Sequence, residues 1–291
     1  MAPGVSAAIR APAPLAARAE SPSEQQQPIL EANGIHLAYH RKNGETQPIL
    51  NDFSLRLREQ EVVALLGPSG VGKSTLLRVL AGLQQPDAGA MRAFGAAMHK
   101  THPRVGVVFQ DAHLLPWKTV RGNVGVGLNF ANQPRITAAE RRAREDAALA
   151  EVDLAGTADL MPSALSGGMA QRVALARCLV RQPAVLLLDE PFSALDAVTR
   201  AAMQGLLLQV VRNHDAAAVL VTHDIDEALR VADRVLLLHG QPASLAGSWT
   251  LPRSSSGEAR PVPTALREQI VAALAAPSAR KGDHPSILES A

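Results

Sequence analysis

The chain has 291 residues, which is enough for one large domain or two small ones. Its 29 lysines and arginines against 27 aspartates and glutamates leave a net charge of +2, so a basic nucleic-acid-binding surface is not indicated. Apolar residues make up 47% and aromatic residues only 3%, which excludes wholesale disorder, and the single cysteine, Cys178, excludes a disulfide framework and a site with several cysteine ligands.

The first regular pattern follows an N-terminal tail. Residues 1–28 are rich in alanine, proline, serine and glutamine, and we expect a disordered tail there, with a transit peptide as the alternative. Phe53, Leu55 and Leu57 alternate with polar residues, the period-two pattern of a half-exposed strand. The dense apolar run Val62–Leu66 is far shorter than the roughly 20 residues of a membrane helix, and it suits a strand buried on both faces of a parallel sheet.

Further strands are predicted at 105–109, 184–188, 218–221 and 235–238, with helical patterns between them. This alternation predicts an α/β domain with a largely parallel sheet. Between Gln110 and Leu165 the strand pattern is interrupted, and Thr137 with Glu140 forms the capping box of a charged helix, which indicates an inserted helical subdomain. Residues 241–291 are expected to form a proline-rich tail with one short helix.

A glycine-rich segment, GPSGVGKST, directly follows the strand Val62–Leu66. It fits the phosphate-binding P-loop, in which successive backbone N–H groups surround a phosphate at the positive end of the following helix. The Lys73 ammonium would reach the β- and γ-phosphates, and the Ser74 hydroxyl would be a ligand of Mg²⁺. The nucleotide-binding residues predicted here are Gly67, Pro68, Ser69, Gly70, Val71, Gly72, Lys73, Ser74 and Thr75.

Two acidic residues, Asp189 and Glu190, come directly after the apolar strand 184–188. Ligands of parallel sheets bind at the carboxyl ends of the strands, which is where this pair lies. Asp189 would hold Mg²⁺, and Glu190 would orient or deprotonate the attacking water. A solvated pair at a strand end is the alternative, and the P-loop favours the catalytic interpretation.

Residues 165–172 read LSGGMAQR, which adds a third motif. With the P-loop, the acidic pair, Gln110 after one strand and Thr222-His223-Asp224 after another, the chain resembles the nucleotide-binding subunits of ABC transporters from about residue 29 to 240. The resemblance implies a P-loop NTPase fold of the ABC type over 29–240. It would contain an antiparallel β subdomain and an inserted α-helical subdomain at about 111–168.

The resemblance also implies roles for matching residues. Tyr39 would stack on adenine, with an ordinary strand aromatic as the alternative. Gln110 would touch Mg²⁺ and the attacking water, and His223 would contact the γ-phosphate. Ser193 and Asp196 would belong to the D-loop, which crosses the interface between two ATPase subunits.

The LSGGMAQR segment begins a helix, and small residues at a helix N-terminus form an anion site. In the family this site binds the γ-phosphate held by the P-loop of the other subunit, so that two ATP molecules lie between head-to-tail subunits. The residues implied to reach that ATP are Leu165, Ser166, Gly167, Gly168 and Gln171. The expected cofactors are therefore ATP and Mg²⁺, and the expected partner is a second ATPase subunit.

Residues 107–118, VVFQDAHLLPWK, look like the nitrate/taurine/sulfonate import branch, and most like its aliphatic-sulfonate import ATPases. This resemblance implies ATP hydrolysis that drives uptake through a separate integral-membrane permease and a periplasmic solute-binding protein. The subunit would lie peripherally on the cytoplasmic face of the inner membrane and would bind no nucleic acid.

Other solutes and one other class of function remain open. Importers of taurine, nitrate, pyrimidine precursors or another organic solute, such as an unrelated organic anion, are alternatives, because solute specificity resides in the binding protein and the permease. A soluble ABC ATPase without a membrane partner is an alternative from a different class. The apolar stretch ending at Trp117 argues against it, because such a loop fits a groove for a permease helix, unless Trp117 anchors the helical subdomain.

Overall fold

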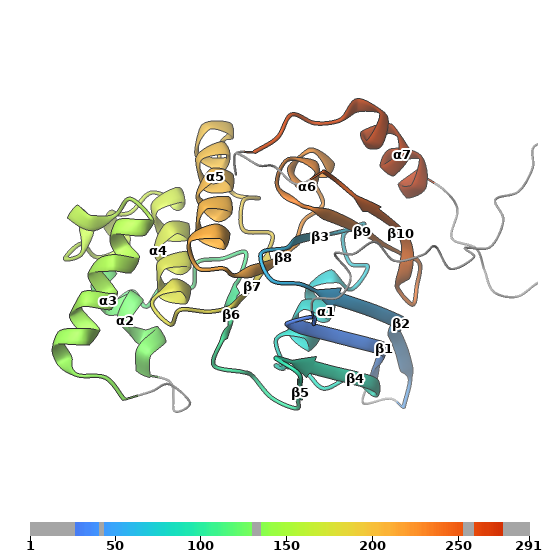
Figure 1. The fold of residues 1–291 in the computed structure, drawn as a ribbon, viewed down its shortest axis with the longest axis horizontal. Coiled ribbons are helices and arrows are strands. Elements are labelled where there is room, and N and C mark those ends of the chain that lie inside the picture. The colour runs from blue at the N-terminus through green and yellow to red at the C-terminus, as the bar shows by residue number, and fades with distance from the viewer. Residues whose placement is uncertain (1–26, 41–43, 130–134, 253–258, 276–291) are drawn as a thin grey trace, which may run out of the picture.

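A computed structural model describes residues 27–40, 44–129, 135–252 and 259–275, and the chain forms two sheets with helices around them (Figure 1). Residues 1–26 of the predicted disordered tail lie outside the described part. None of the helices in the described ranges is long and apolar enough to cross a membrane.

The larger sheet has six strands in the order β10-β9-β3-β8-β7-β6. All neighbouring strands are parallel except the pair β9 and β10. The strands are β3 (Val62–Leu66), β6 (Val105–Val108), β7 (Val185–Asp189), β8 (Ala217–Val221), β9 (Arg234–His239) and β10 (Ser244–Thr250). The prediction of an α/β domain with a largely parallel sheet is confirmed.

Helix α1 (Lys73–Leu80) lies between one face of this sheet and a second, smaller sheet (Figure 1). The smaller sheet is antiparallel, with strand order β2-β1-β4-β5. Its strands are β1 (Leu30–His40), β2 (Thr46–Leu57), β4 (Ala88–Ala93) and β5 (Ala96–Ala97). Phe53, Leu55 and Leu57 of β2 are buried against α1 and the odd-numbered residues of β3, as their alternation predicts.

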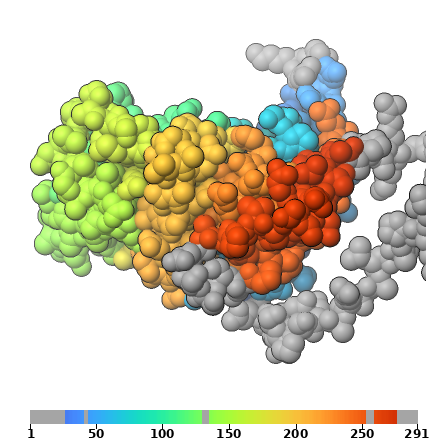
Figure 2. All heavy atoms as spheres, turned by 90° about the horizontal axis from the view of Figure 1, so that it is seen from above, coloured from blue at the N-terminus to red at the C-terminus, as the bar shows by residue number. Residues whose placement is uncertain are grey.

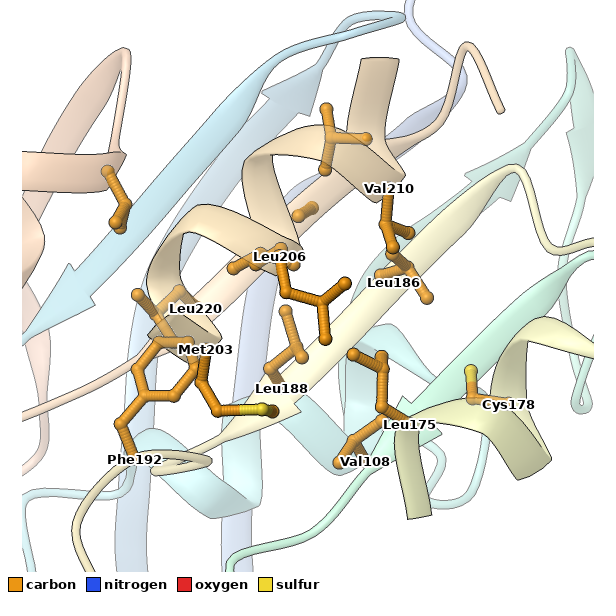
Figure 3. Packing of buried hydrophobic residues seen from close by; sticks show 14 of the residues in the cluster. Val108, Leu175, Cys178, Leu186, Leu188, Phe192, Met203, Leu206, Val210 and Leu220 are labelled. Atoms are coloured by element: carbon orange, nitrogen blue, oxygen red, sulfur yellow. The ribbon is translucent and has the colours of Figure 1, made fainter. Parts of the chain in front are cut away.

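The opposite face of the larger sheet is covered by helices α4 (Gly167–Leu179), α5 (Ala197–Asn213), α6 (Ile225–Val231) and α7 (Thr264–Ala275). Met203 and Leu206 of α5 pack over Leu188 of β7 (Figure 3). Cys178 of α4 faces the same layer and is buried, and this burial raises the pKa of its thiol to about 12.

A helical lobe lies at one end of the molecule (Figure 1). It follows β6 in the chain and contains α2 (Val120–Gly125), α3 (Ala138–Glu151) and α4. Three short 3₁₀ turns, Val126–Asn129, Ala155–Thr157 and Pro162–Ala164, connect these helices. The Thr137–Glu140 capping box begins α3 as predicted.

The larger sheet extends beyond the predicted domain boundary at residue 240. Strand β10 follows that boundary and pairs with β9. Its sequence, SLAGSWT, is mostly exposed, so it lacks the apolar alternation that reveals a strand. The predicted tail helix exists as α7, whose Ile270 is fully buried, and α7 lies on the surface in Figure 2.

Candidate functional site

Three neighbouring strands of the larger sheet bring the predicted catalytic segments together. In register, Leu65 of β3 pairs with Val221 of β8, and Val221 pairs with Asp189 of β7. The P-loop, the acidic pair and the His223 segment therefore begin at the same edge of the sheet. This is the edge at which ligands bind in parallel sheets.

The P-loop has a backbone that requires glycine at specific positions. Gly70 and Gly72 have φ angles of 77° and 112°, which side chains rarely adopt. A Cβ atom at Gly67 would lie 2.6 Å from the carbonyl oxygen of Leu238 in β9. The loop thus lies close against the sheet before it enters α1.

Lys73, the first residue of α1, is buried, and its Nζ donates to the carbonyl oxygens of Gly67 and Pro68 at 2.9 and 3.0 Å. Burial lowers the pKa of this ammonium, while the carboxylates of Glu190 and Asp189 act in the opposite direction. The positive charge is therefore held inside the loop, close to where the motif places a phosphate.

Ser74 and Asp189 form the oxygen-rich part of the site. The Ser74 hydroxyl donates to Oδ1 of Asp189 at 3.0 Å. Burial raises the pKa of Asp189, and the hydrogen bond from Ser74 opposes this shift. The described residues contain no cluster of three histidine, cysteine or acidic side chains that could hold a metal ion. A hydroxyl and one carboxylate fit Mg²⁺, which takes oxygen ligands and shares them with phosphates and water.

Glu190 has a φ angle of 46°, which a residue other than glycine rarely adopts. Its Oε2 lies 3.2 Å from Nδ1 of His223, which is the residue after Thr222 at the end of β8. Strained backbone of this kind is concentrated at functional sites. Two of the three residues predicted to be catalytic, Glu190 and His223, are thus in direct contact.

Two further predicted residues reach the same cluster. The Gln110 amide donates to the Ser193 hydroxyl at 3.3 Å, and that hydroxyl donates to the main-chain carbonyl of Glu190 at 3.0 Å. The Tyr39 hydroxyl lies 3.0 Å from the Thr75 hydroxyl in α1. The structure therefore places Tyr39 beside the P-loop, where an adenine-stacking ring is expected.

The LSGGMAQR segment lies elsewhere. Ser166 is the N-cap of α4 and accepts a hydrogen bond from the Met169 amide at 3.3 Å. Helix α4 belongs to the helical lobe, whereas α1 lies between the two sheets (Figure 1). Gln171 differs from expectation, because it is buried and its amide donates to the Phe109 carbonyl at 3.1 Å. Gln171 thus ties α4 to the residue before Gln110 and does not face outward.

A groove of about 750 Å³ is lined in part by Phe109, the residue before Gln110. Its lining includes Arg78, Leu83, Val107, Phe109, His113 and Arg177. Arg177 of α4 donates to the carbonyl oxygens of Ala112 and His113 at 2.6 and 2.9 Å, and so fixes the loop after Gln110. No sequence pattern indicates this role of Arg177, since an arginine on a helix is ordinarily solvated.

Trp117 follows in the same loop, and 71% of its side chain is exposed. The alternative that Trp117 anchors the helical subdomain is therefore wrong. The exposed indole instead lies in the same loop as His113, which lines the groove.

These features define a P-loop nucleoside triphosphatase: a buried lysine in a glycine-rich loop, an acidic pair and a histidine, all at one sheet edge. Comparison with known proteins narrows the class. The ABC transporter family matches residues 50–193. The aliphatic sulfonates import ATP-binding protein SsuB 1 of Xanthomonas axonopodis pv. citri is 46% identical over 224 residues, which cover 76% of this chain and 87% of that protein.

Two other comparisons agree. The aliphatic sulfonates import ATP-binding protein SsuB of Pseudomonas putida is 42% identical over 263 residues, 90% of this chain and 94% of that protein. A solved dimeric ATP-binding cassette, in a post-hydrolysis state bound to ADP and Pi, is 30% identical with a TM-score of 0.69, covering 78% of this chain and all of that one. The chain belongs to the ABC transporter family, as an ATP-binding subunit that couples ATP hydrolysis to transport.

Proposed function

We propose that this subunit drives the import of aliphatic sulfonates through a separate membrane permease, and that it hydrolyses ATP with Mg²⁺ in a head-to-tail homodimer. The observation that carries the site assignment is the convergence of Lys73, Ser74, Asp189, Glu190 and His223 at one edge of the sheet. The sulfonate assignment is supported by the names of the relatives described above.

In this proposal the role of each residue follows from its position in the site. Lys73 would bind the β- and γ-phosphates. Ser74, Asp189 and Gln110 would hold Mg²⁺, which would neutralise phosphate charge. Glu190 accepts a proton from the attacking water. The contact at 3.2 Å keeps His223 beside that carboxylate, where the histidine would contact the γ-phosphate.

A second subunit completes the site. The main-chain amides at the start of α4, after Ser166, would bind a phosphate held by the other subunit, since α4 lies in the helical lobe and not beside the P-loop of its own chain. The segment with Ser193 and Asp196 lies next to Gln110 and leads into α5. In a dimer in which the P-loop of one subunit faces the α4 N-terminus of its partner, the α4 amides would bind phosphate and the 193–196 segment would lie at the interface.

The permease is proposed to occupy the groove lined in part by Phe109. This groove is lined by both apolar and cationic side chains, among them Phe109, and the next residue, Gln110, contacts the catalytic cluster through Ser193. Occupation of the groove can therefore influence the site of hydrolysis. The subunit would then lie on the cytoplasmic face of the inner membrane, with a periplasmic binding protein on the other side.

The dimer is tested with the Glu190→Gln variant, which keeps the shape of the side chain but removes its charge. We expect ATP to bind, hydrolysis to fall by a factor on the order of a hundred or more, and a dimer to persist in size-exclusion chromatography with ATP. Adding Ser166→Arg should abolish that dimer, because a bulky side chain would occupy the α4 N-terminus. A double variant that still dimerises only with ATP would refute the head-to-tail arrangement.

The solute is tested by reconstituting the subunit with its permease and binding protein in vesicles. Alkanesulfonate should stimulate ATP hydrolysis and uptake, with the Lys73→Ala variant as the inactive control. Stimulation by taurine or nitrate without stimulation by alkanesulfonate would refute the sulfonate assignment and leave the ATPase assignment intact.

A further inference from the structure

A polar cavity of about 160 Å³ adjoins the catalytic histidine. Its lining includes Glu190, Ser193, Arg200, His223, Asp224 and Glu227. Two of these residues, Arg200 and Glu227, have no role in the site described so far. Both come from helices that start directly after a catalytic segment, α5 after residues 193–196 and α6 after His223 and Asp224.

Arg200 makes contacts with two catalytic segments at once. Its Nη2 donates to the main-chain carbonyl of Leu195 at 3.0 Å, and its Nη1 lies 3.7 Å from Oδ2 of Asp224. The planar guanidinium holds two acceptors in a fixed relation, which a lysine ammonium cannot do. One side chain therefore joins the 193–196 segment to the residue after His223.

The charge of Arg200 does not stabilise the helix on which it lies. It occupies the first turn of α5, where the positive end of the helix dipole disfavours a cation. An arginine at this position is explained by what its side chain reaches, which is Leu195 and Asp224.

Asp224 connects Arg200 to the start of α6. Its Oδ1 accepts hydrogen bonds from the amides of Asp226 and Glu227 at 2.9 and 3.1 Å and so caps α6, while Oδ2 faces Arg200. His223 is the preceding residue and contacts Glu190. A displacement of the 193–196 segment thus reaches the catalytic pair through Arg200 and Asp224.

The cavity leaves room for these groups to move. Among the described residues, Nε of Arg200 and Oε1 of Glu227 are buried without a protein partner. A polar cavity of this size has room for water, which would give such atoms partners. The contact between the two segments therefore borders a cavity and is not fixed by close packing on that side.

We propose that Arg200 is a positioning residue for ATP hydrolysis, which couples the 193–196 segment to His223. The inference rests on the proposed roles of His223 and of that segment. Because residues 193–196 are expected to meet the second subunit, Arg200 makes the position of His223 depend on whether the dimer has formed.

The test measures ATP turnover by the purified full-length chain. Arg200→Met, which keeps an unbranched apolar stem, should lower kcat about tenfold or more by misplacing His223, with KM for ATP changed less than twofold. Arg200→Lys should restore part of the activity, because it keeps the charge and one donor. The matched control is Arg267→Met, which removes an arginine that pairs with Asp226 of α6 at 2.7 Å but contacts no catalytic segment in the described part.

A second comparison asks whether Arg200 acts through His223. In a His223→Ala background, Arg200→Met should cause no further loss of kcat. Equal losses for Arg200→Met and Arg267→Met, or full additivity with His223→Ala, would overturn the inference. If His223→Ala lowers kcat but Arg200→Met does not, the positioning role of Arg200 is refuted and the site assignment stands. If His223→Ala leaves turnover unchanged, the site assignment itself is refuted.

Discussion

Burial raises the pKa of Glu227, a residue of α6, to about 7. The hydrogen bond with Thr222 and the charge of Arg200 lower this pKa, while the carboxylates of Asp224 and Glu190 raise it. A carboxyl group with a pKa near 7 carries less negative charge beside Glu190 at neutral pH than an exposed glutamate does. At the scale of single residues, the site thus limits repulsion toward the phosphates.

The pKa of Glu227 predicts a pH-dependent stability. Glu227 loses its proton near pH 4.5 in the unfolded chain and near pH 7 in the native chain. Between these values, only the native state holds the proton. The free energy of unfolding should therefore fall as the pH rises through this window, by at most about 3 kcal/mol from this group. Glu227→Gln should remove that fall.

Urea denaturation of the wild-type chain and of Glu227→Gln, at pH 5 and pH 8, measures the effect. The gain in stability of the variant should be larger at pH 8. Glu268→Gln, which changes an exposed glutamate of α7, is the control and should show no such difference. A gain that is the same at both pH values would contradict the prediction.

At the scale of elements, the position of the P-loop depends on its approach to β9. Gly67→Ala places a Cβ atom 2.6 Å from the Leu238 carbonyl oxygen, so the loop has to move away from the sheet. ATP affinity should fall about tenfold or more, because the amides that surround a phosphate lose their alignment. Fluorescent-nucleotide binding measures the loss.

Gly205→Ala is the matched control for this change. Gly205 lies in α5, and a methyl group added there would meet open space, so alanine should be neutral or stabilising. Equal ATP affinity in the Gly67→Ala variant and the wild type would show that the loop accommodates the methyl group without moving.

The sequence predicts those elements whose pattern depends on local constraints. Buried strands such as β3 and the loop with Lys73 were predictable, because full burial demands apolar runs and phosphate binding demands glycine. Strand β10 was not, since an exposed edge strand needs no apolar alternation. Gln171 bonds to Phe109, 62 residues away, and Arg200 pairs with Asp224, 24 residues away. Contacts between residues so far apart in the chain produce no pattern in the local sequence.

At the scale of the whole molecule, the groove lined in part by Phe109 and the exposed Trp117 both involve the loop that leaves β6. If this surface meets the permease, Trp117→Ala should weaken the association by about 2 kcal/mol. ATP binding should stay unchanged, because the indole is 71% exposed and supports no core.

Pull-down with the detergent-solubilised permease, alongside binding of labelled ATP, measures both effects. Leu245→Ala is the control, since it removes an exposed apolar side chain from β10 at the opposite edge of the larger sheet. Undiminished capture of the permease by Trp117→Ala would place the contact surface elsewhere.

The buried thiol of Cys178 has a consequence for chemical reactivity. With a pKa of about 12, only on the order of one molecule in ten thousand carries the nucleophilic thiolate at pH 8. The Cys178 thiol of the folded chain should therefore react far more slowly with oxidants and alkylating reagents than an exposed thiol does. Because this is the only cysteine, a cysteine introduced at the exposed Val198 would carry a label alone, and spin or dye labels there could follow the approach of two subunits in solution.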